Sequence, residues 1–452
     1  MLKDFISTLK NKKVSVIGAG VSNTPLIRML LGCCELYVHD KKHEEQFDKD
    51  FLNELNAHNV QLVLGEHYLD KLEGDVIFRT PGVRPDVPAP EDAKKRGALI
   101  TSEMDVFFSL CPCPITAITG SDGKTTTSTI IAELLRAQGF DVFLGGNIGE
   151  PLLPRLDLMN EHSRVVVELS SFQLMDMTHS PNVAVITNVT PNHLDWHKGM
   201  EEYTQAKYNL LSRQSAGNIC VLNYDDTTTR DFGQKCTAAV KYFSLTEMAQ
   251  GYSFDGQYIR KDSKAILKAD ELRIPGIHNV ANFMAALAAT EHEVNIDSIM
   301  HVAHTFMGVE HRIEFTRELD GVKYYNDSIA SSPTRAQAGL MCFDCPVVLI
   351  AGGYDKKIAF DELGELICKR VDTLMLCGAT ADKIEAAVKN AKEPKKPEIY
   401  RFDDLKSTVL ACRKIAKSGS VVLFSPACAS FDQFPNFMER GRFFKAVVNE
   451  LK

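Results

Sequence analysis

The sequence reads ITAITGSDGKTTTSTIIAELL from Ile115 to Leu135, and its pattern indicates how the middle of the chain folds. Residues 115–119 are apolar or β-branched, which is typical of a short buried strand. After Ser128, apolar side chains recur at helical spacing, at Ile130, Ile131, Leu134 and Leu135. The pattern therefore predicts a strand, a glycine-rich turn at residues 120–125, and a helix that begins at the turn.

The turn GSDGKT has the composition of a phosphate-binding loop. Its glycines let backbone N–H groups and the positive end of the helix face an anion, Lys124 adds a mobile charge, and a threonine hydroxyl can reach Mg2+. It matches the short form GxxGK[ST], because Ile118 stands where the longer GxxxxGK[ST] has its first glycine. An ordinary strand-to-helix turn is the alternative that this stretch alone leaves open.

Length and composition restrict the class of protein. With 452 residues, of which 44% are hydrophobic, the chain can bury a large core, and its length suggests about three domains. A formal net charge of −8 argues against a general nucleic-acid or anionic-membrane binder, but it permits a local pocket for small anions. No apolar run approaches the roughly 20 residues that cross a bilayer, and the start MLKDFISTLKNKK lacks signal-peptide features, so we expect a cytoplasmic protein.

The cysteines give no sign of a metal or redox site. Twelve of them are scattered through expected strands and helices, as buried thiols are in a reducing compartment. The only CxxC runs from Cys342 to Cys345 and has no second pair at zinc-ribbon spacing.

Three times the chain runs an apolar strand into glycines: VSVIGAG at 14–20, ITAITGSDGK at 115–124 and VVLIAGGYDKK at 347–357. Strands that alternate with helical patterns indicate parallel sheets, so the sequence predicts three α/β units. With boundaries near Ser102 and Gly308, the expected domains are residues 1–102, 103–309 and 310–452.

The first unit contains a nucleotide-like turn. GAGVSN resembles a dinucleotide-fold turn whose third glycine is replaced by Asn23, and the next strand, LYVHD, ends in Asp40. The turn RTPGVRPD at 79–86 also follows a strand, at the carboxyl end where open sheets bind ligands. A nucleotide site with Asp40 near the ribose or base and a turn that serves only the fold both remain open.

Acidic and basic side chains follow the loop at the ends of later strands. Glu168 ends the β-branched strand 165–167, where phosphate-loop enzymes place a carboxylate that holds Mg2+ beside the loop hydroxyl. The alternative is a solvent-exposed carboxylate at a strand end.

The next expected strand ends in Asn188, and a turn then delivers His193, Asp195 and His197. Lys207 follows on an expected helix whose apolar face includes Tyr203, Tyr208 and Leu211. Such residues are usually structural when they stand alone. Here they follow a predicted Mg-ATP site, which favours a functional interpretation.

Together these motifs resemble one known family across all three units, the Mur ligases, which are ATP-dependent amide-forming enzymes of peptidoglycan synthesis. The motifs that carry the resemblance are GSDGKTTT, ELSSFQL, NVTPNHLDWH, YTQAK, GIHNVANFMAA, EHRIE, YYNDS and SPACASFDQFPNFMERG. Within the family, ELSSFQL and the last motif are similar to the members that add D-glutamate, and the DNPR motif of a diaminopimelate-adding relative is absent.

The resemblance implies a Rossmann-like N-terminal domain, a central phosphate-loop ATPase-like domain and a Rossmann-like C-terminal domain. They would bind UDP-N-acetylmuramoyl-L-alanine, ATP and D-glutamate, respectively. The implied reaction makes an acyl phosphate from the L-alanine carboxylate, which the D-glutamate amine then attacks. The implied enzyme is cytoplasmic and monomeric, without nucleic-acid or membrane partners.

The resemblance also assigns two Mg2+ ions and a modified lysine. Thr125 and Glu168 would flank one ion, and His193 and Lys207 would serve the other. Lys207 matches the family lysine that CO2 converts to a carbamate, which requires a neutral amine. The implied catalytic residues are Lys124, His193, Lys207 and His311.

Other binding residues are carried over in three groups. The implied ATP contacts are Gly120, Ser121, Asp122, Gly123, Lys124, Thr125, Thr126, Asn147, Asn279, Asn282, Arg312 and Asp327. The implied UDP-substrate contacts are Gly20, Val21, Ser22, Asp40, Lys41, Thr80, Pro81, Gly82 and Asn147. The implied D-glutamate contacts are Lys356, Ser430 and Phe437. Some relatives have a lysine directly after NDS where this chain has Ile329, so one carboxylate contact is unassigned, with Ser331 or Thr334 as candidates.

Two other functions are weighed against this one. A ligase of the folylpolyglutamate-synthase type would share the ATP loop and the modified lysine, but the Rossmann-like first unit and the ELSSFQL and DQF motifs argue against it. A nonenzymatic nucleotide-binding protein would not need Lys124, Glu168, His193 and Lys207 together. The turn GAGVSN alone would also suggest a nicotinamide dehydrogenase.

Overall fold

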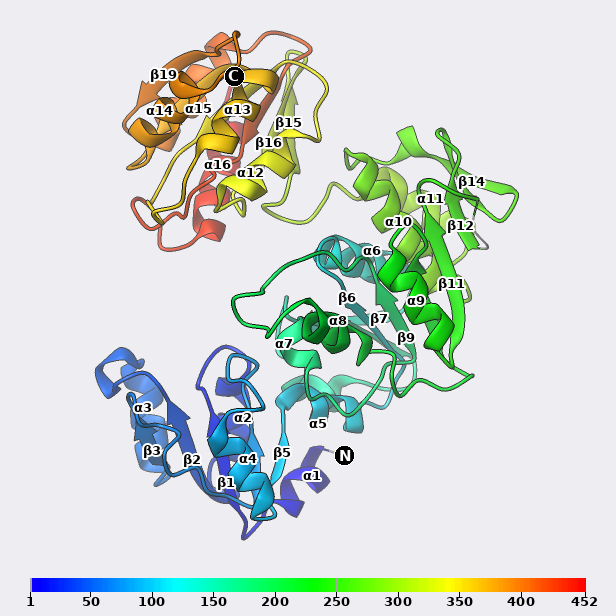
Figure 1. The fold of residues 1–452 in the computed structure, drawn as a ribbon, viewed down its shortest axis with the longest axis vertical. Coiled ribbons are helices and arrows are strands. Elements are labelled where there is room, and N and C mark those ends of the chain that lie inside the picture. The colour runs from blue at the N-terminus through cyan, green and yellow to red at the C-terminus, as the bar shows by residue number, and fades with distance from the viewer. Residues whose placement is uncertain (1, 249–250) are drawn as a thin grey trace. The chain divides into compact units, whose positions relative to one another are not determined.

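A computed structural model describes residues 2–248 and 251–452. The chain divides into two compact units, Met1–Ala269 with Ala281–Val302 and Asp270–Val280 with Ala303–Lys452. The first unit contains a five-stranded and a nine-stranded sheet, and the second contains a six-stranded sheet. In Figure 1 the colours run from blue to cyan through the first sheet, from cyan to green through the second, and from yellow to red through the third.

The first sheet is parallel throughout, with strand order β3-β2-β1-β4-β5. Its strands are β1 Lys13–Ile17, β2 Glu35–Asp40, β3 Gln61–Leu64, β4 Val76–Phe78 and β5 Leu99–Thr101. Its helices are α1 Leu2–Thr8, α2 Asn23–Leu30, η1 Glu44–Gln46, α3 Lys49–Ala57 and α4 Pro88–Lys95. The chain moves outward from β1 in one direction and then returns to the other side of β1, and ligands bind beside such a switch in open sheets.

The second sheet has the order β14-β13-β12-β11-β10-β9-β6-β8-β7. Its strands are β6 Ile115–Thr119, β7 Asp141–Gly146, β8 Ser163–Glu168, β9 Val183–Ile186, β10 Ile219–Asn223, β11 Ala239–Ser244, β12 Gly251–Phe254, β13 Tyr258–Lys261 and β14 Lys264–Lys268. Its helical segments are α5 Glu103–Leu110, α6 Lys124–Ala137, η2 Leu153–Leu158, α7 Ser171–Leu174, α8 Met200–Tyr208, α9 Thr227–Lys235, η3 Ala269–Glu271, α10 Ile277–Thr290 and α11 Ile296–Thr305. Strand β6 is buried at every position and lies between β8 and β9, so the chain changes direction at the strand that carries the glycine-rich loop.

In the third sheet, with order β15-β16-β20-β17-β18-β19, β15 is antiparallel to β16 and the other pairs are parallel. Its strands are β15 Glu314–Leu319, β16 Val322–Asn326, β17 Val347–Ala351, β18 Val371–Cys377, β19 Glu398–Phe402 and β20 Val421–Phe424. Its helices are α12 Pro333–Leu340, α13 Asp361–Arg370, α14 Ala381–Asn390, α15 Leu405–Ile415 and α16 Phe437–Glu450. Side chains of α12, α13 and α14 share one buried core with the sheet and those of α15 and α16 share another, so the helices cover both faces.

Several local predictions are confirmed and two are wrong at the edges. Strand 115–119 and the helix that follows the turn lie where the pattern predicts them. Strand β9 ends at Ile186, two residues before Asn188, and α8 ends at Tyr208, so Leu211 is buried in the turn beyond the helix. Cys342 and Cys345 are both free thiols. No helix in the described ranges is long and apolar enough to span a membrane. The domain boundaries at 102 and 309 stay predictions.

Candidate active site

The glycine-rich loop takes a backbone shape that only glycine accommodates. Gly123 has φ +79°, and a Cβ atom there would lie 2.4 Å from Oδ1 of Asn282. A Cβ atom at Gly120 would lie 1.9 Å from the hydroxyl oxygen of Thr187. Side chains therefore cannot enter the loop without displacing its neighbours, and the free N-terminus of α6 lies directly behind it.

Polar groups that follow β9 hold the loop from the side. The Ser121 backbone N–H donates to the Asn188 carbonyl at 3.0 Å, and the Asp122 N–H donates to Asn188 Oδ1 at 2.9 Å. The Ser121 hydroxyl donates to the Thr190 carbonyl at 2.8 Å and lies 2.9 Å from the Tyr203 hydroxyl. The loop is thus tied both to the end of β9 and to α8.

Two lysines converge on one carbonyl of this loop. The Lys124 ammonium donates to the carbonyl oxygens of Gly120, at 2.9 Å, and Ser121, at 2.8 Å. The Lys207 amine, from α8, donates to the same Gly120 oxygen at 2.7 Å. The Lys124 ammonium beside a glycine loop at a helix N-terminus makes a site suited to a highly charged anion.

Lys207 is nearly completely buried, with 1% of its surface exposed. Burial, followed by the positive charge of Lys124, lowers the pKa of Lys207 to about 6. Its Nζ also lies over the Tyr203 ring, 4.5 Å from the centroid. A neutral amine is therefore accessible at this position near neutral pH, which is the chemical requirement for a carbamate.

Glu168 offers a carboxylate oxygen with no protein partner. The residue is 1% exposed, and its register partner in β6 is Ile118, two residues before the loop. Its Oε1 accepts from the Asn147 side-chain amide at 3.0 Å, whereas buried Oε2 has no hydrogen-bond partner among the residues that the structure describes. Mg2+ takes oxygen ligands, and a buried carboxylate oxygen left without a donor fits that need.

His193 lies in the loop before α8 and is exposed, with φ +54° and its ring 5.0 Å from that of Phe172. Within residues 2–248 and 251–452, no three His, Cys, Asp or Glu side chains gather as a ready metal site. The residues predicted for the two ions include only two side chains of those types, Glu168 and His193. The donor set fits a cation that retains water and substrate phosphate oxygens as ligands, as Mg2+ does.

The nucleotide-like turns of the first sheet lie beside one another. The Gly18 turn, with φ +83°, packs so closely on Thr80 that a Cβ atom would lie 3.0 Å from the Thr80 methyl carbon. The Asp40 carboxylate accepts from the backbone N–H groups of Ala19, at 2.7 Å, and Lys42, at 2.9 Å. Asp40 thus holds together the loops that follow β1 and β2. Val21, between them and α2, is 83% exposed.

The helix α10 carries both predicted adenine contacts, and each asparagine is 7% exposed. Asn282 Oδ1 accepts from the Thr127 hydroxyl at 3.3 Å, which places it next to the first turn of α6. Asn279 donates from its side-chain amide to the Pro275 carbonyl at 2.6 Å.

In the second unit, three residues predicted to contact the nucleotide or the reacting groups flank the β15–β16 pair: His311 and Arg312 precede β15, and Asp327 directly follows β16. Asp327 is buried, accepts from the Ser425 hydroxyl at 2.7 Å, and has its pKa raised to about 7 by burial. His311 is 3% exposed, and its Nδ1 atom lies 2.9 Å from the side-chain nitrogen of Asn326. Burial lowers the pKa of His311, which favours the neutral imidazole. Arg312 follows it directly.

The residues predicted to hold D-glutamate lie on the loops at the carboxyl ends of β17 and β20. Lys356 is exposed, and Phe437 begins α16. Ser430 is 2% exposed, and its hydroxyl has no hydrogen-bond partner.

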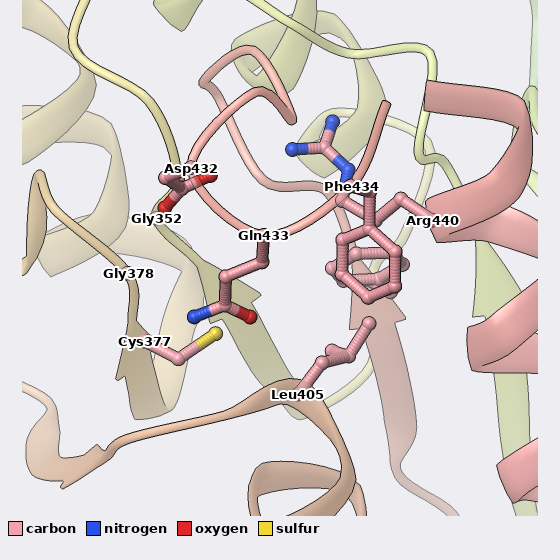
Figure 2. Close-up of a pocket in the computed structure, with 10 residues that line it drawn as sticks. Gly352, Cys377, Gly378, Leu405, Asp432, Gln433, Phe434 and Arg440 are labelled. Atoms are coloured by element: carbon pink, nitrogen blue, oxygen red, sulfur yellow. The ribbon is translucent and has the colours of Figure 1, made fainter. Parts of the chain in front are cut away.

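A small, partly open hollow lies next to these loops. In Figure 2, Asp432, Gln433 and Phe434 lie above Cys377 and Leu405, and Arg440 lies beside Phe434. The full lining is Gly352, Gly353, Cys377, Gly378, Leu405, Phe424, Asp432, Gln433, Phe434 and Arg440. The hollow is distinct from the predicted D-glutamate contacts, since its lining includes none of them.

Arg440 is a structurally important residue that the sequence analysis did not assign. It is 3% exposed, and its guanidinium donates to the carbonyls of Ser328 at 2.8 Å, Cys428 at 3.0 Å and Ala429 at 2.9 Å. It therefore fixes the loop that carries Ser430 to the segment after Asp327. Arg440 belongs to the sequence motif MERG, but the residues that it contacts are more than ten positions away in sequence, so the motif alone does not identify them.

Comparison with known families gives three matches along the chain. Residues 13–88 match the MurD N-terminal domain, residues 118–290 the Mur ligase middle domain, and residues 311–428 the Mur ligase glutamate ligase domain. The UDP-N-acetylmuramoylalanine–D-glutamate ligase of Acetivibrio thermocellus is 50% identical over 463 residues, covering 100% of this chain and 99% of that protein. The enzyme of the same name from Clostridium acetobutylicum is 46% identical, covering 99% of each.

Solved structures share the fold at much lower identity. The UDP-N-acetylmuramate–alanine ligase of Thermotoga maritima gives a TM-score of 0.57 at 18% identity, covering 98% of this chain and 100% of that one. A UDP-N-acetylmuramoyl-L-alanyl-D-glutamate–2,6-diaminopimelate ligase gives 0.60 at 18% identity, covering 84% and 94%. With half of its residues shared over the full length of a relative, and with all three domain types present in order, this α/β chain belongs to the Mur ligase family, in the branch of the UDP-N-acetylmuramoylalanine–D-glutamate ligases.

Proposed function

We propose that this chain is the ATP-dependent ligase that joins D-glutamate to the L-alanine carboxylate of UDP-N-acetylmuramoyl-L-alanine in cytoplasmic peptidoglycan precursor synthesis. Full-length relatives at 50% and 46% identity support the assignment, and the match of residues 13–88 to the MurD N-terminal domain favours it over a folylpolyglutamate-type ligase. The observation that carries it is the phosphate loop on which Lys124 and buried Lys207 meet at the Gly120 carbonyl.

The chemistry has two steps. A carboxylate oxygen of the L-alanyl group attacks the γ-phosphorus of ATP, the bond to the bridging oxygen breaks, and ADP leaves. The amine of D-glutamate then attacks the acyl phosphate carbon, phosphate leaves, and the amine loses a proton as the amide forms. Both steps bring anions together, so the site must supply positive charge and oriented N–H groups.

This chain supplies that charge at the loop between β6 and α6. We assign Lys124 and the backbone N–H groups of the loop to the ATP phosphates, with Asn282 beside the helix start for the adenine. Thr125, Glu168, His193 and Lys207 would hold Mg2+, which supplies Lewis-acid stabilisation of the phosphoryl oxygens when bound. The unpartnered Oε2 of Glu168 supports this donor set.

We propose that Lys207 is present as a carbamate in the active enzyme. The amine is 1% exposed and faces the positive charge of Lys124, conditions that disfavour a second ammonium and favour an anion. Carbamylation adds CO2 to the neutral amine and releases one proton, and the resulting carboxylate is a metal ligand that an unmodified lysine is not.

The substrates occupy separate surfaces in this proposal. The turns at 18–22, 40–41 and 80–82 would hold the UDP group, since they lie at the point where the first sheet changes direction. Lys356, the Ser430 loop and the start of α16 would hold D-glutamate. We also propose that the chain forms three domains, at residues 1–102, 103–309 and 310–452, and that the protein is a monomer.

The decisive experiment measures phosphate release from ATP and Mg2+ with UDP-N-acetylmuramoyl-L-alanine, in parallel with D-glutamate, with L-glutamate and with no amino acid. We expect release that depends on D-glutamate, together with a product whose mass is that of the amide. The Lys124→Ala variant should bring release down to background. Release without D-glutamate, or release without an amide product, would overturn the proposal.

A further inference from the structure

A cluster of charged residues joins a turn of the first sheet to the start of α8. We call it the Arg84 cluster; it comprises Arg84, Asp86, His197, Lys198 and Glu202. Arg84 and Asp86 follow β4 in the turn that begins at Thr80, and the others lie at the N-terminal end of α8, more than a hundred residues later.

Arg84 uses all five of its guanidinium N–H groups. Nε and Nη2 donate to the two Asp86 oxygens at 2.8 and 3.0 Å, and Nη2 and Nη1 donate to the two Glu202 oxygens at 2.8 and 3.0 Å. Nη1 also donates to the Trp196 carbonyl at 2.6 Å, and the guanidinium lies 4.9 Å from the Trp196 ring centroid. Forked pairing of this kind fixes orientation as well as distance.

Glu202 continues the contacts toward the proposed metal ligands. Its Oε2 accepts from the Lys198 backbone N–H at 2.9 Å and lies 3.3 Å from His197 Nδ1. His197 is 3% exposed, and its Nε2 lies 2.9 Å from the hydroxyl of Ser171. Ser171 begins α7, three residues after Glu168.

The same helix carries the second proposed ligand. Glu202 precedes Tyr203, whose hydroxyl lies 2.9 Å from that of Ser121 in the phosphate loop, and Lys207 follows in the next turn of α8. The Arg84 cluster therefore contacts, through short steps, both segments on which the proposed metal ligands Glu168 and Lys207 lie.

We propose that Arg84 and Glu202 are positioning residues that couple binding of the UDP substrate at the turn 80–82 to the alignment of Glu168 and Lys207. The inference rests on the proposed function. Neither residue need touch the reacting atoms: Arg84 acts through Glu202, and Glu202 acts through α8 and through His197.

The chain contains a single tryptophan, and it lies in this cluster. Trp196 packs against Phe172, with ring centroids 4.5 Å apart, and beneath the Arg84 guanidinium. Its emission therefore reports the state of the cluster without ATP, metal or turnover.

The test uses the full chain and three variants: Arg84→Ala, Arg84→Lys and Glu202→Gln. The matched control is Arg28→Ala, in a helix beside the first sheet. This variant removes the exposed ion pair between Arg28 Nε and a Glu54 carboxylate oxygen, which are 2.8 Å apart. The turn stays anchored in the Arg84 variants, because buried Arg79 still donates from Nε to Asp176 at 2.8 Å. Tryptophan emission is titrated with UDP-N-acetylmuramoyl-L-alanine alone, and kcat, KM and the Mg2+ requirement are measured separately.

We expect saturating UDP substrate to change the emission of the wild type and of Arg28→Ala equally, and to change that of Arg84→Ala and Glu202→Gln several-fold less. In those two variants kcat should fall about 10- to 100-fold, as for a misplaced reacting group, and half-maximal activity should need more Mg2+. The kcat of Arg84→Lys should lie between those of the wild type and Arg84→Ala, since a lysine ammonium keeps the charge but cannot form the forked pairs of a guanidinium. A fourth variant that combines Arg84→Ala with Glu202→Gln should have a kcat no lower than that of the poorer single variant, because both residues act through one set of contacts.

Calorimetry establishes the concentration at which the UDP substrate saturates the wild type. If tryptophan emission does not change at that concentration, the proposed coupling is wrong. The coupling would also be overturned by an Arg84→Ala enzyme that melts at a lower temperature but keeps its kcat, its Mg2+ requirement and its emission change, because that is the result of a merely structural contact. A wild type that binds UDP substrate with an emission change but never releases phosphate would count against the proposed function instead.

Discussion

At Lys207, burial and the neighbouring charge of Lys124 act in the same direction, both against the ammonium form. The proposed carbamate gives this residue a negative charge, so that it becomes an anion beside the Lys124 ammonium and the proposed Mg2+ ion. The modification would therefore account for a lysine among the proposed metal ligands.

The Lys207→Ala variant should lose about 100-fold or more in phosphate release, because a ligand to a metal worth several kcal/mol of charge stabilisation is removed. A small carboxylate such as acetate or formate should restore part of the rate if the missing group is an anion. The measurement is D-glutamate-dependent phosphate release against carboxylate concentration.

The matched control is Lys124→Ala, in which the missing group is a cation, so the same carboxylates should restore nothing. A Lys207→Ala protein that folds and binds ATP but shows no restoration would contradict the anionic role.

Glu103, the first residue of α5, is a second buried ionisable group, with 5% exposure and only the Leu153 backbone N–H as a donor, at 3.1 Å. Burial raises its pKa from 4.5 to about 7. Because the folded state holds the proton more tightly than the unfolded state, stability from this residue is complete below 4.5 and is lost as pH rises to about 7.

The Glu103→Gln variant should therefore be more stable than the wild type at pH 8, on the order of 3 kcal/mol, and similar to it at pH 4.5 to 5. Denaturant unfolding at both pH values measures the difference. An equal difference at the two values would mean that Glu103 does not titrate in this window.

At the scale of elements, the segment β6–loop–α6 illustrates what local sequence can determine. Its strand was predicted with both ends correct and a helix was predicted after the turn, because the apolar spacing and the glycines lie within one contiguous stretch. The helix α6 begins at Lys124, within the turn predicted at residues 120–125. The end of β9 and the end of α8 were each misplaced by a few residues, since Asn188 and Leu211 are used in the turns beyond.

The Arg84 cluster was missed for a different reason. The residues around Arg84 in the sequence do not identify Glu202 as the partner of Arg84, because the two residues meet only when β4 and α8 are folded. The same holds for Arg440, whose acceptors lie in two other loops. Local patterns located the loop and the ligand-bearing strand ends, while contacts between distant segments required the structure.

Replacing Gly123 by alanine tests the loop as an element. The left-handed φ of +79° and a Cβ placed 2.4 Å from Asn282 both oppose a side chain. The cost of about 1–2 kcal/mol should weaken ATP binding by about tenfold, measured by calorimetry with a non-hydrolysable ATP analogue.

Gly217→Ala is the control, because a Cβ there meets nothing within 4 Å and its φ is not positive. It should bind the analogue as the wild type does. Equal binding by Gly123→Ala would mean that the loop adapts at no cost.

Across the whole molecule, the three strand-to-glycine stretches have the same place in three sheets. They are β1, β6 and β17, and each lies where its sheet changes direction: β1 lies between β2 and β4, β6 between β8 and β9, and β17 between β18 and β20. The proposed UDP, ATP and D-glutamate contacts follow these three strands. One rule of open α/β sheets thus accounts for the placement of three different ligands.

This arrangement predicts separable effects of metal removal. Chelation with EDTA should reduce phosphate release to background, and added Mg2+ should restore it, because the proposed metal ligands hold the ion at the phosphate loop. These ligands lie on strands, loops and helices of the second sheet. Binding of UDP-N-acetylmuramoyl-L-alanine, measured by calorimetry in EDTA, should persist, since its proposed contacts follow strands of the first sheet.

An enzyme from which EDTA also removes UDP-substrate binding would contradict this division of labour. A matched titration with UDP alone gives the reference for the nucleotide part of the substrate.

The burial of Lys207 also has a practical consequence. A group that is 1% exposed exchanges small molecules with solvent only when its surroundings open. The proportion of modified enzyme would then depend on how much dissolved carbon dioxide the protein had met before the assay, and would adjust slowly when that concentration changed. Two batches of identical sequence would differ in specific activity according to the gas with which their cultures were supplied.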